Sequence, residues 1–332
     1  MKLIKMGKNP ATDAAAYKHA VSLLKAGELV AFPTETVYGL GADASNLMAV
    51  AKIFAAKQRP ANHPVIIHIA KLEDLTQWAS EIPEAVYKLA DKFWPGPLTI
   101  ILHAATHVPP IITGGQKTIG IRMPGHPVAG KLLTLFNGAI AAPSANRFGR
   151  ISPTCAEHVI EELDDVVDLV LDGGPCSVGL ESTIIDLTSV KPRLLRPGPI
   201  AIEQISELLG ETVITDKNNA PRVSGSLPVH YAPQTPMQII SSDEIEKKLP
   251  QLQKQYTNIV VMSCKPYKTS MLHITWQVMP ENPKNYGQLL YAQLRNLDNL
   301  AFDLIVVEEP PDDNHWLAIK DRLIRASAND SL

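Results

Sequence analysis

Short apolar segments alternate along this chain with segments of helical pattern, and each apolar segment ends in glycine, proline or polar residues. Apolar runs with such boundaries are typical of buried strands. Their alternation with amphipathic helices predicts an α/β fold. In the N-terminal part we expect strands at 29–32, 65–69, 98–102, 118–122, 140–143, 169–172, 184–187 and 193–196, and helices at 14–25, 47–56, 83–93, 155–163 and 202–209.

A proline-rich stretch, residues 211–236, interrupts this pattern and predicts a linker. Its His230-Tyr-Ala-Pro233 segment is too aromatic for a passive tether. We therefore expect a first domain at 1–210 and a second at 237–332, and a chain of 332 residues is long enough for both. The second domain is expected to be a smaller α/β domain with a mostly parallel sheet, with strands at 237–240, 259–263 and 304–307 and helices at 286–300 and 316–326.

The composition is that of a globular protein, with 45% apolar and 20% charged residues. A net charge of −3 provides no basic field for tight nucleic-acid binding. The three cysteines are far apart, which argues against a disulfide framework and favours a reducing compartment. No apolar run reaches membrane-spanning length, and the first ten residues are too polar for a signal peptide. We expect a cytoplasmic protein that does not bind membranes.

Polar side chains cluster just after the first apolar strand. Thr34, Glu35, Thr36 and Tyr38 follow it directly, and Gly39 and Gly41 come next, where the backbone can approach a ligand or take positive φ. Ligands of open α/β sheets bind at the carboxyl ends of strands, so we expect a substrate loop here. The alternative interpretation is a polar turn with two permissive glycines.

Other strand and helix ends show the same pattern. Lys57 and Arg59 follow the helix at 47–56. Either they take part in the site, or they simply cap the C-terminus of that helix. His68 interrupts an apolar strand, and it is either a ligand-binding residue or a structural histidine with its hydrogen bonds satisfied. Arg122 ends the strand at 118–122, where it is either an anion-binding fork or an exposed charge.

The strand at 140–143 leads into Ser144-Ala-Asn146 and then Ser152-Pro153-Thr154. Small hydroxyl and amide groups suit phosphate or ribose contacts, although Ser152–Thr154 also reads as the N-cap of the helix at 155–163. Taken together, the polar strand ends predict a polyanion site along one edge of the sheet. Neither a G-x-x-x-x-G-K-S/T loop nor a G-x-G-x-x-G motif is present, so those two routes to nucleotide binding are not supported.

Several motifs occur together in an order that resembles the YrdC/Sua5 family. They are PTETVYGLG at 33–41, Lys57-x-Arg59, Ser144-x-Asn146, STIIDL at 182–187 and LLRPG at 194–198. The segments YAQLRNLDNLAFDLIVVEEP and WLAIKDRLIRAS resemble the additional domain of Sua5-type members. The resemblance implies a YrdC-like α/β domain with a large twisted sheet and a Rossmann-like C-terminal domain. It also implies an L-threonylcarbamoyladenylate synthase, a nucleotidyltransferase that makes threonylcarbamoyl-AMP and pyrophosphate from L-threonine, bicarbonate and ATP. That product serves modification of adenosine 37 in tRNAs reading codons that start with A.

The resemblance also assigns site residues. It implies catalytic roles for Lys57, Arg59, Ser144 and Asn146, and Mg²⁺ bound with ATP and no organic cofactor. ATP contacts are implied for Arg59, His63, Thr118, Ser144, Ser152, Arg196 and Tyr231, and L-threonine contacts for Thr36, His68, Arg122, Ala142 and Ser182, with Thr34 and Tyr38 shaping the pocket. Lys57, Arg59 and Arg196 would clamp the triphosphate, and Arg122 would pair with the threonine carboxylate. The linker, with Tyr231 over the nucleotide, would be the lid, but its Gly225–Pro233 sequence lacks the basic residues of the family motif GMKYRHYAP.

Partners implied in this way are a downstream tRNA threonylcarbamoyl-transferase complex and tRNA itself, bound weakly or indirectly. Two alternative functions are an RNA-binding module without catalysis and a carbamoyl-adenylate enzyme of the hydrogenase-maturation kind. The acidic balance and 5% aromatic content disfavour the first. The cysteine spacing offers no zinc finger, which disfavours the second.

Overall fold

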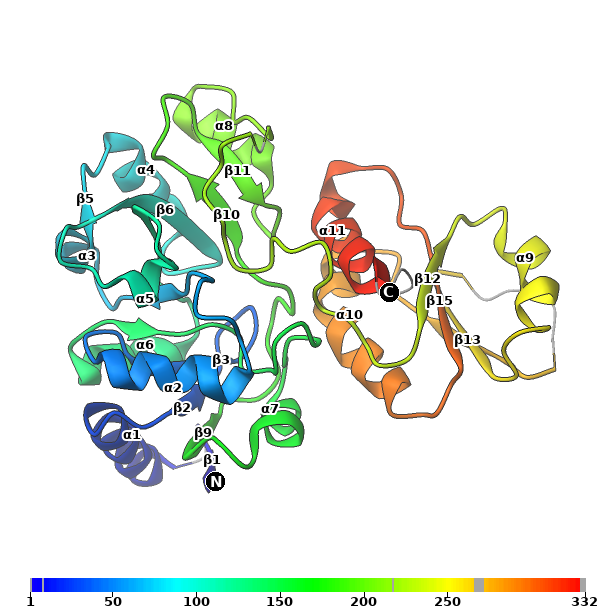
Figure 1. Ribbon diagram of the computed structural model, residues 1–332, viewed down its shortest axis with the longest axis horizontal. Coiled ribbons are helices and arrows are strands. Elements are labelled where there is room, and N and C mark those ends of the chain that lie inside the picture. Colours follow the sequence, from blue (N-terminus) through cyan, green and yellow to red (C-terminus); the bar gives the residue numbers. More distant parts are fainter. Residues whose placement is uncertain (1, 8, 217, 266–271, 329–332) are drawn as a thin grey trace. The chain divides into compact units, whose positions relative to one another are not determined.

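The computed structural model describes residues 2–7, 9–216, 218–265 and 272–328, and it divides into two compact units (Figure 1). The first unit comprises Met1–Phe148 and Ser152–Ser226, and the second comprises Gly149–Ile151 and Leu227–Leu332. The predicted linker is therefore divided, because residues 211–226 belong to the first unit and residues 227–236 to the second.

The first unit is built on an eleven-stranded mixed sheet in the order β1-β9-β2-β3-β8-β4-β7-β6-β10-β11, with β5 paired to β6. Strands β2, β3, β8 and β4 alternate in direction, whereas β4 and β7 run parallel. The bounds are β1 Lys2–Lys5, β2 Val30–Phe32, β3 Gly39–Asp43, β4 Ile66–His68, β5 Ala79–Ser80, β6 Leu98–Ala104, β7 Thr118–Arg122, β8 Ile140–Ala141, β9 Leu169–Asp172, β10 Thr183–Asp186 and β11 Arg193–Arg196.

Helices cover this sheet on both faces, because successive residues of a strand point to opposite sides. In β2, Ala31 joins one core cluster and Phe32 the other. The larger cluster contains the apolar sides of α2 (Leu47–Lys57), α4 (Glu84–Phe93), α7 (Ala156–Leu163) and α8 (Ile202–Leu209). The smaller cluster contains those of α1 (Pro10–Lys25) and α6 (Pro127–Phe136). Short helical turns, η1 (Leu72–Asp74), α3 (Leu75–Trp78) and α5 (Pro110–Thr113), complete the unit.

Gly39 and Gly41 do not lie in the expected substrate loop, because they belong to strand β3. Neither has positive φ; instead, the sheet packs too closely for a side chain at Gly41. A Cβ on Gly41 would lie 2.7 Å from Phe32 Cε1 and 3.1 Å from the Val30 carbonyl oxygen. The polar segment before them, residues 34–38, is the connection of the β2–β3 hairpin.

Three predicted helix starts in the first unit also differ. Helix α1 begins at Pro10 with Asn9 as its cap, since the Asn9 side chain accepts from the backbone N–H groups of Ala11 and Thr12. Pro83 is the N-cap residue of α4 rather than part of its first turn. Helix α7 is preceded by Cys155, which makes no side-chain cap, so the N-cap role considered for Ser152–Thr154 is wrong.

The second unit contains a four-stranded sheet, β12-β15-β13-β14, in which every pair is parallel, as predicted. Its strands are β12 Met237–Ile240, β13 Ile259–Ser263, β14 Ile274–Val278 and β15 Leu304–Glu308, and its helices are α9 Ile245–Leu252, α10 Pro283–Asp298, η2 Asn314–Trp316 and α11 Leu317–Ser327. Strand β14 was not predicted, because its side chains are partly exposed and its apolar residues form no continuous run. Within the described residues, no helix is both long and apolar enough to cross a bilayer.

We expect Gly41→Ala to lower the free energy of unfolding by about 2 kcal/mol, because the added methyl group overpacks the sheet. Gly130→Ala is the matched control, because nothing lies within 4 Å of a Cβ at this position of α6. Alanine there should raise stability by about 0.5–1 kcal/mol through helix propensity. Urea unfolding of both variants measures the two effects, and equal stabilities would contradict the packing argument.

Candidate functional site

The Arg122 side chain is buried at the end of β7, with 4% of its surface exposed. Its Nη1 donates to Thr36 Oγ1 (2.9 Å), its Nε donates to the Gly96 carbonyl (3.2 Å), and its Nη2 lies 2.6 Å from Glu35 Oε1. The alternative of an exposed strand-end charge is therefore wrong. The arginine instead connects the end of β7 to the polar β2–β3 connection.

His68 pairs with Arg122 in the register of β4 and β7, and 3% of its surface is exposed. Burial, and then the Arg122 charge, lowers the pKa of His68 well below its ordinary value. Its Nδ1 has no hydrogen-bond partner among the described residues. The alternative of a satisfied structural histidine is therefore not supported, and His68 is a neutral imidazole with a polar atom available beside Arg122.

Lys57 ends α2 and is buried. Its Nζ donates to the backbone carbonyls of Ser144 and Asn146, and its own carbonyl accepts from the Phe148 N–H (2.8 Å). Burial, and then the Arg59 charge, lowers the Lys57 pKa well below its ordinary value. The lysine therefore fixes the Ser144–Asn146 segment to the end of α2, and it does more than cap that helix.

Arg59 and Arg196 meet at one residue of the predicted linker stretch, Ser224. Arg59 Nη2 donates to Ser224 Oγ (3.2 Å) and to the Pro64 carbonyl (2.8 Å). Arg196 Nη1 donates to the Ser224 carbonyl (2.9 Å). Both arginines are buried, with 7% and 4% of their surfaces exposed.

Ser182 extends this network towards the Arg122 cluster. Arg196 Nη2 donates to Ser182 Oγ (3.1 Å), which also shares a hydrogen bond with Thr99 Oγ1 (2.7 Å). Thr99 lies beside Ile100 of β6, and Ile100 pairs with Ile121, the neighbour of Arg122. The register therefore places Thr99 beside Arg122, so the predicted threonine residues and the predicted phosphate residues lie near one another.

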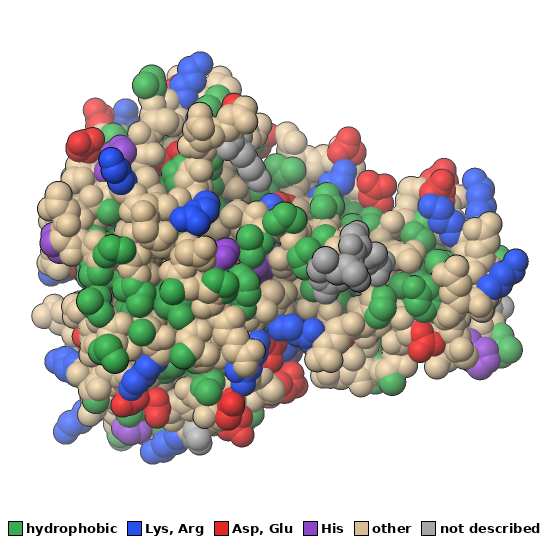
Figure 2. Space-filling model, in the orientation of Figure 1, with side chains coloured by type: hydrophobic (Ala, Val, Ile, Leu, Met, Phe, Trp, Pro, Cys, Tyr) green, Lys and Arg blue, Asp and Glu red, His purple; other side chains and the backbone are tan. Residues whose placement is uncertain are grey.

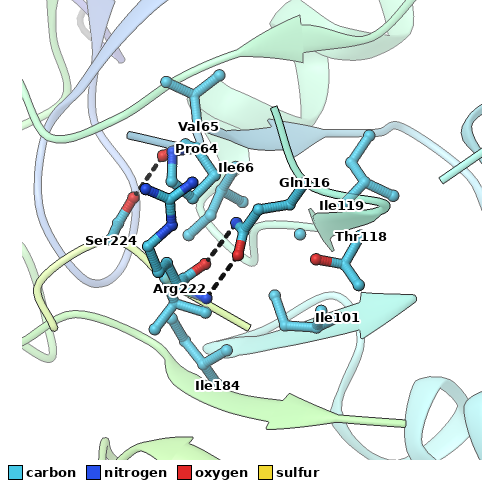
Figure 3. A pocket seen from close by; sticks show the side chains of 12 residues that line it. Pro64, Val65, Ile66, Ile101, Gln116, Thr118, Ile119, Ile184, Arg222 and Ser224 are labelled. Carbon is cyan, nitrogen blue, oxygen red and sulfur yellow. Dashed lines mark hydrogen bonds between the residues drawn. The ribbon is translucent and has the colours of Figure 1, made fainter. Parts of the chain in front are cut away.

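Thr118 lines a narrow pocket (Figure 3). The pocket floor is apolar sheet, and Gln116, Arg222 and Ser224 lie at its rim. His63 is near this region, since Arg59 and Arg222, after burial, lower the pKa of His63. The Phe148 ring contacts both the His63 ring (5.3 Å between centroids) and the Arg59 guanidinium (5.8 Å). Arg222 therefore lies near both Thr118 and His63, and Arg59 lies near His63.

The remaining predicted residues have other surroundings. Ser152 donates to Glu181 Oε1 (2.6 Å), and the Ala142 N–H donates to the Ile66 carbonyl. Thr34 Oγ1 hydrogen-bonds Thr36 Oγ1 (2.8 Å), whereas the Tyr38 hydroxyl donates to the Gly174 carbonyl (2.7 Å). Tyr231 belongs to the second unit, where its ring stacks on Tyr291 (5.7 Å) and lies beside the Arg322 guanidinium (5.4 Å).

The prediction of a single shared sheet edge is wrong. Strands β4 and β7 run opposite to β2 and β8, so the carboxyl ends of these strands lie at opposite ends of the sheet. Side-chain reach connects the groups instead: Arg122 extends to the β2–β3 connection and Lys57 to the segment after β8.

Sequence reasoning did not assign Glu35, Gln116, Arg222 or Ser224 to the site. Glu35 was detectable from its position in the polar cluster after the first strand. The other three residues carry no motif, and Arg222 and Ser224 lie in a stretch whose composition resembles a linker.

Fold and site together define an α/β protein in which buried arginines, a histidine and hydroxyl groups lie in two neighbouring polar clusters. Residues 22–198 match the Sua5/YciO/YrdC family model, described as "Telomere recombination". Residues 200–328 match the Sua5 C-terminal model, described as "Threonylcarbamoyl-AMP synthase, C-terminal domain". The chain belongs to the Sua5/YciO/YrdC family and has both Sua5 domains, which confirms the resemblance inferred from its motifs.

Similar proteins cover almost the whole chain. Threonylcarbamoyl-AMP synthase of Pyrococcus abyssi is 40% identical, over 93% of each chain. The enzyme of the same name from Bacillus subtilis is 39% identical, over 93% of this chain and 92% of its own. The crystal structure of P. abyssi Sua5 complexed with L-threonine superimposes with a TM-score of 0.89 at 37% identity, over 98% of this chain and 97% of that one. This similarity confirms the predicted two-domain α/β fold.

The lowered pKa of His68 makes stability depend on pH. Below the ordinary histidine value of about 6.5, the unfolded chain binds a proton at this residue and the folded chain does not, so stability falls as pH falls. We expect urea unfolding between pH 7 and pH 5 to show a His68 contribution of up to about 1.4 kcal/mol per pH unit. His68→Gln should flatten the curve by that amount. If the two proteins instead show the same dependence of stability on pH, His68 is protonated in the folded protein as it is in the unfolded chain.

Proposed function

We propose that this chain is a threonylcarbamoyl-AMP synthase that uses L-threonine, bicarbonate and ATP. The observation that carries the proposal is that the Arg122–His68 cluster lies close to Arg59 and Arg196, which both bond Ser224. Arg196 also donates to Ser182, which shares a hydrogen bond with Thr99, and the register of β6 and β7 places Thr99 beside Arg122. An amino acid and a polyphosphate have to be held side by side for this reaction. The names of the relatives, and the L-threonine bound to P. abyssi Sua5 in its crystal structure, support the same conclusion.

L-threonine would bind among Thr36, His68, Arg122, Ala142 and Ser182. The Arg122 fork suits its carboxylate, and Glu35, held by the Gly125 N–H (3.0 Å), fixes the orientation of the guanidinium. The neutral imidazole of His68 offers its unpartnered Nδ1 to a polar group of the substrate. A neutral ring avoids adding a second positive charge next to Arg122.

The proposed reaction is an adenylyl transfer. The threonine amine and bicarbonate give a carbamate and water; a carbamate oxygen then forms a bond to the α-phosphorus of ATP, and the bond to the β-phosphate oxygen breaks. Pyrophosphate leaves with that electron pair. No covalent enzyme nucleophile is needed, since positioning and charge stabilisation carry such chemistry.

Arg59 and Arg196 would stabilise the departing pyrophosphate, and His63, Thr118, Ser144 and Ser152 would contact the nucleotide. Lys57 would act together with Asn146 by fixing the Ser144–Asn146 segment, because the Lys57 amine donates to the backbone carbonyls of Ser144 and Asn146. The described residues contain no group of three or more His, Cys, Asp or Glu that could hold a metal ion. We propose that Mg²⁺ enters with ATP, whose phosphate oxygens are its usual ligands.

Closure over the site is expected because a carbamate and an acyl-phosphate anhydride are lost readily in water. Tyr231 is the proposed closing residue. It has a φ of 64°, and 1% of its surface is exposed.

We propose a cytoplasmic location and a downstream tRNA-modifying partner, with tRNA bound weakly or indirectly. Cys155, Cys176 and Cys264, all within the described part of the chain, are thiols, which suits a reducing compartment. Acidic and basic side chains are interspersed on the face shown in Figure 2, a distribution that does not favour an RNA-binding module.

We expect purified protein to release pyrophosphate from ATP only when both L-threonine and bicarbonate are present. Arg59→Ala should lower this rate by about 100-fold, the usual cost of removing a charge-stabilising donor. Lys52→Ala is the control, because Lys52 lies on the surface of α2 in an exposed pair with Glu28. Release without threonine, or equal rates for Arg59→Ala and wild type, would refute the proposal.

Arg122 should control the binding of threonine rather than the binding of ATP. Removing it alone leaves Glu35 buried and unpaired, so the informative variant is Arg122→Gln combined with Glu35→Gln. We expect the KM for threonine to rise by at least about tenfold, while the KM for ATP stays within about twofold. Glu35→Gln alone serves as the comparison, and equal changes in both KM values would contradict the assigned role.

A further inference from the structure

Residues Arg222–Ser224, which we call the strap, cross one face of the sheet of the first unit (Figure 3). The Gln116 side chain makes two hydrogen bonds with the Arg222 backbone (3.0 and 2.7 Å), and Arg222 Nη2 donates to the Gly114 carbonyl (2.9 Å). Val223 is 5% exposed and joins an apolar cluster with sheet residues. The strap is therefore an ordered part of the first unit, although its composition resembles a linker.

Ser224, at the end of the strap, contacts both buried arginines of the proposed phosphate site. Its Oγ accepts from Arg59 (3.2 Å) and donates to the Pro64 carbonyl (3.1 Å), so both hydroxyl roles are in use. Its carbonyl accepts from Arg196 (2.9 Å). One residue therefore orients two like charges.

We infer that Ser224 is a positioning residue that holds Arg59 and Arg196 together as a paired anion site. The inference rests on the proposed function, because the anion is the polyphosphate of ATP or the departing pyrophosphate. The hydroxyl acts on Arg59 through a side-chain bond and the carbonyl acts on Arg196 through a backbone bond. Removing the hydroxyl should therefore affect Arg59 and leave the Arg196 bond intact.

The chain supplies a matched control in Ser226. Its Oγ donates to the Val223 carbonyl (2.8 Å), and its backbone N–H donates to the same oxygen, so it belongs to the same segment. These bonds hold Ser226 to the strap itself rather than to Arg59 or Arg196. If the two serines merely stabilise the strap, Ser224→Ala and Ser226→Ala should behave alike.

The test uses the full-length protein and inorganic pyrophosphate as the probe, measured by calorimetry, together with KM values for ATP and threonine. We expect Ser224→Ala to weaken pyrophosphate binding by about tenfold, the effect typical of losing a hydrogen bond to a charged group. The KM for ATP should rise similarly and the KM for threonine should not. Ser224→Thr keeps the hydroxyl and should restore binding, and Ser226→Ala should bind as wild type does.

The inference is overturned if Ser224→Ala binds pyrophosphate like wild type, if Ser226→Ala loses as much affinity, or if Ser224→Thr remains as weak as the alanine variant. It is also overturned if the wild-type protein does not bind pyrophosphate. Ser224-dependent pyrophosphate binding in a protein that makes no threonylcarbamoyl-AMP would leave the anion site standing and refute the proposed function.

Discussion

The buried charge of Arg122 sets the arrangement of the candidate site. A guanidinium taken out of water costs several kcal/mol unless charge and hydrogen bonds compensate for it. Glu35 supplies the charge, and Thr36 and the Gly96 carbonyl supply acceptors. Glu35 and Thr36 come from the β2–β3 connection, so the conformation of that connection and the position of Arg122 are determined together. Burial, and then the same charge, lowers the pKa of His68 well below its ordinary value, which leaves a polar, uncharged ring beside the fork.

The second part of the site solves a different electrostatic problem, since Arg59 and Arg196 both carry positive charge in a buried region. Neutral oxygens accept from them: the Ser224 hydroxyl and carbonyl, the Pro64 carbonyl and Ser182. Dipoles of this kind orient a cation. Two guanidinium groups that bond the same residue also place two positive charges close together, which favours a polyanion at this location.

Much of the fold was predictable from the sequence because buried strands and amphipathic helices leave a local pattern. Strands β7, β9 and β11 have the predicted bounds, and so does helix α8. Strand β3 was not predicted because Gly39-Leu-Gly41 resembles a loop, and its glycines reflect close packing on Phe32, a contact between strands. For the site, motif residues such as Arg122 and Lys57 were predictable, but the direction of each strand was not. That direction depends on long-range pairing, and it places the polar strand ends at opposite ends of the sheet.

Ser224 and Glu35 show why the residues that orient the arginines of a site are harder to predict than the arginines themselves. A serine in a proline-rich stretch has no periodicity or spacing that marks it, and its role follows from the positions of Arg59 and Arg196, which lie far away in sequence. Such partners also determine how much reorganisation a ligand requires. Hydrogen bonds already formed to the arginines hold their guanidinium groups in place before the substrate arrives, so less of the binding free energy is lost to ordering them. The site is thus preorganised by residues that contact the principal groups.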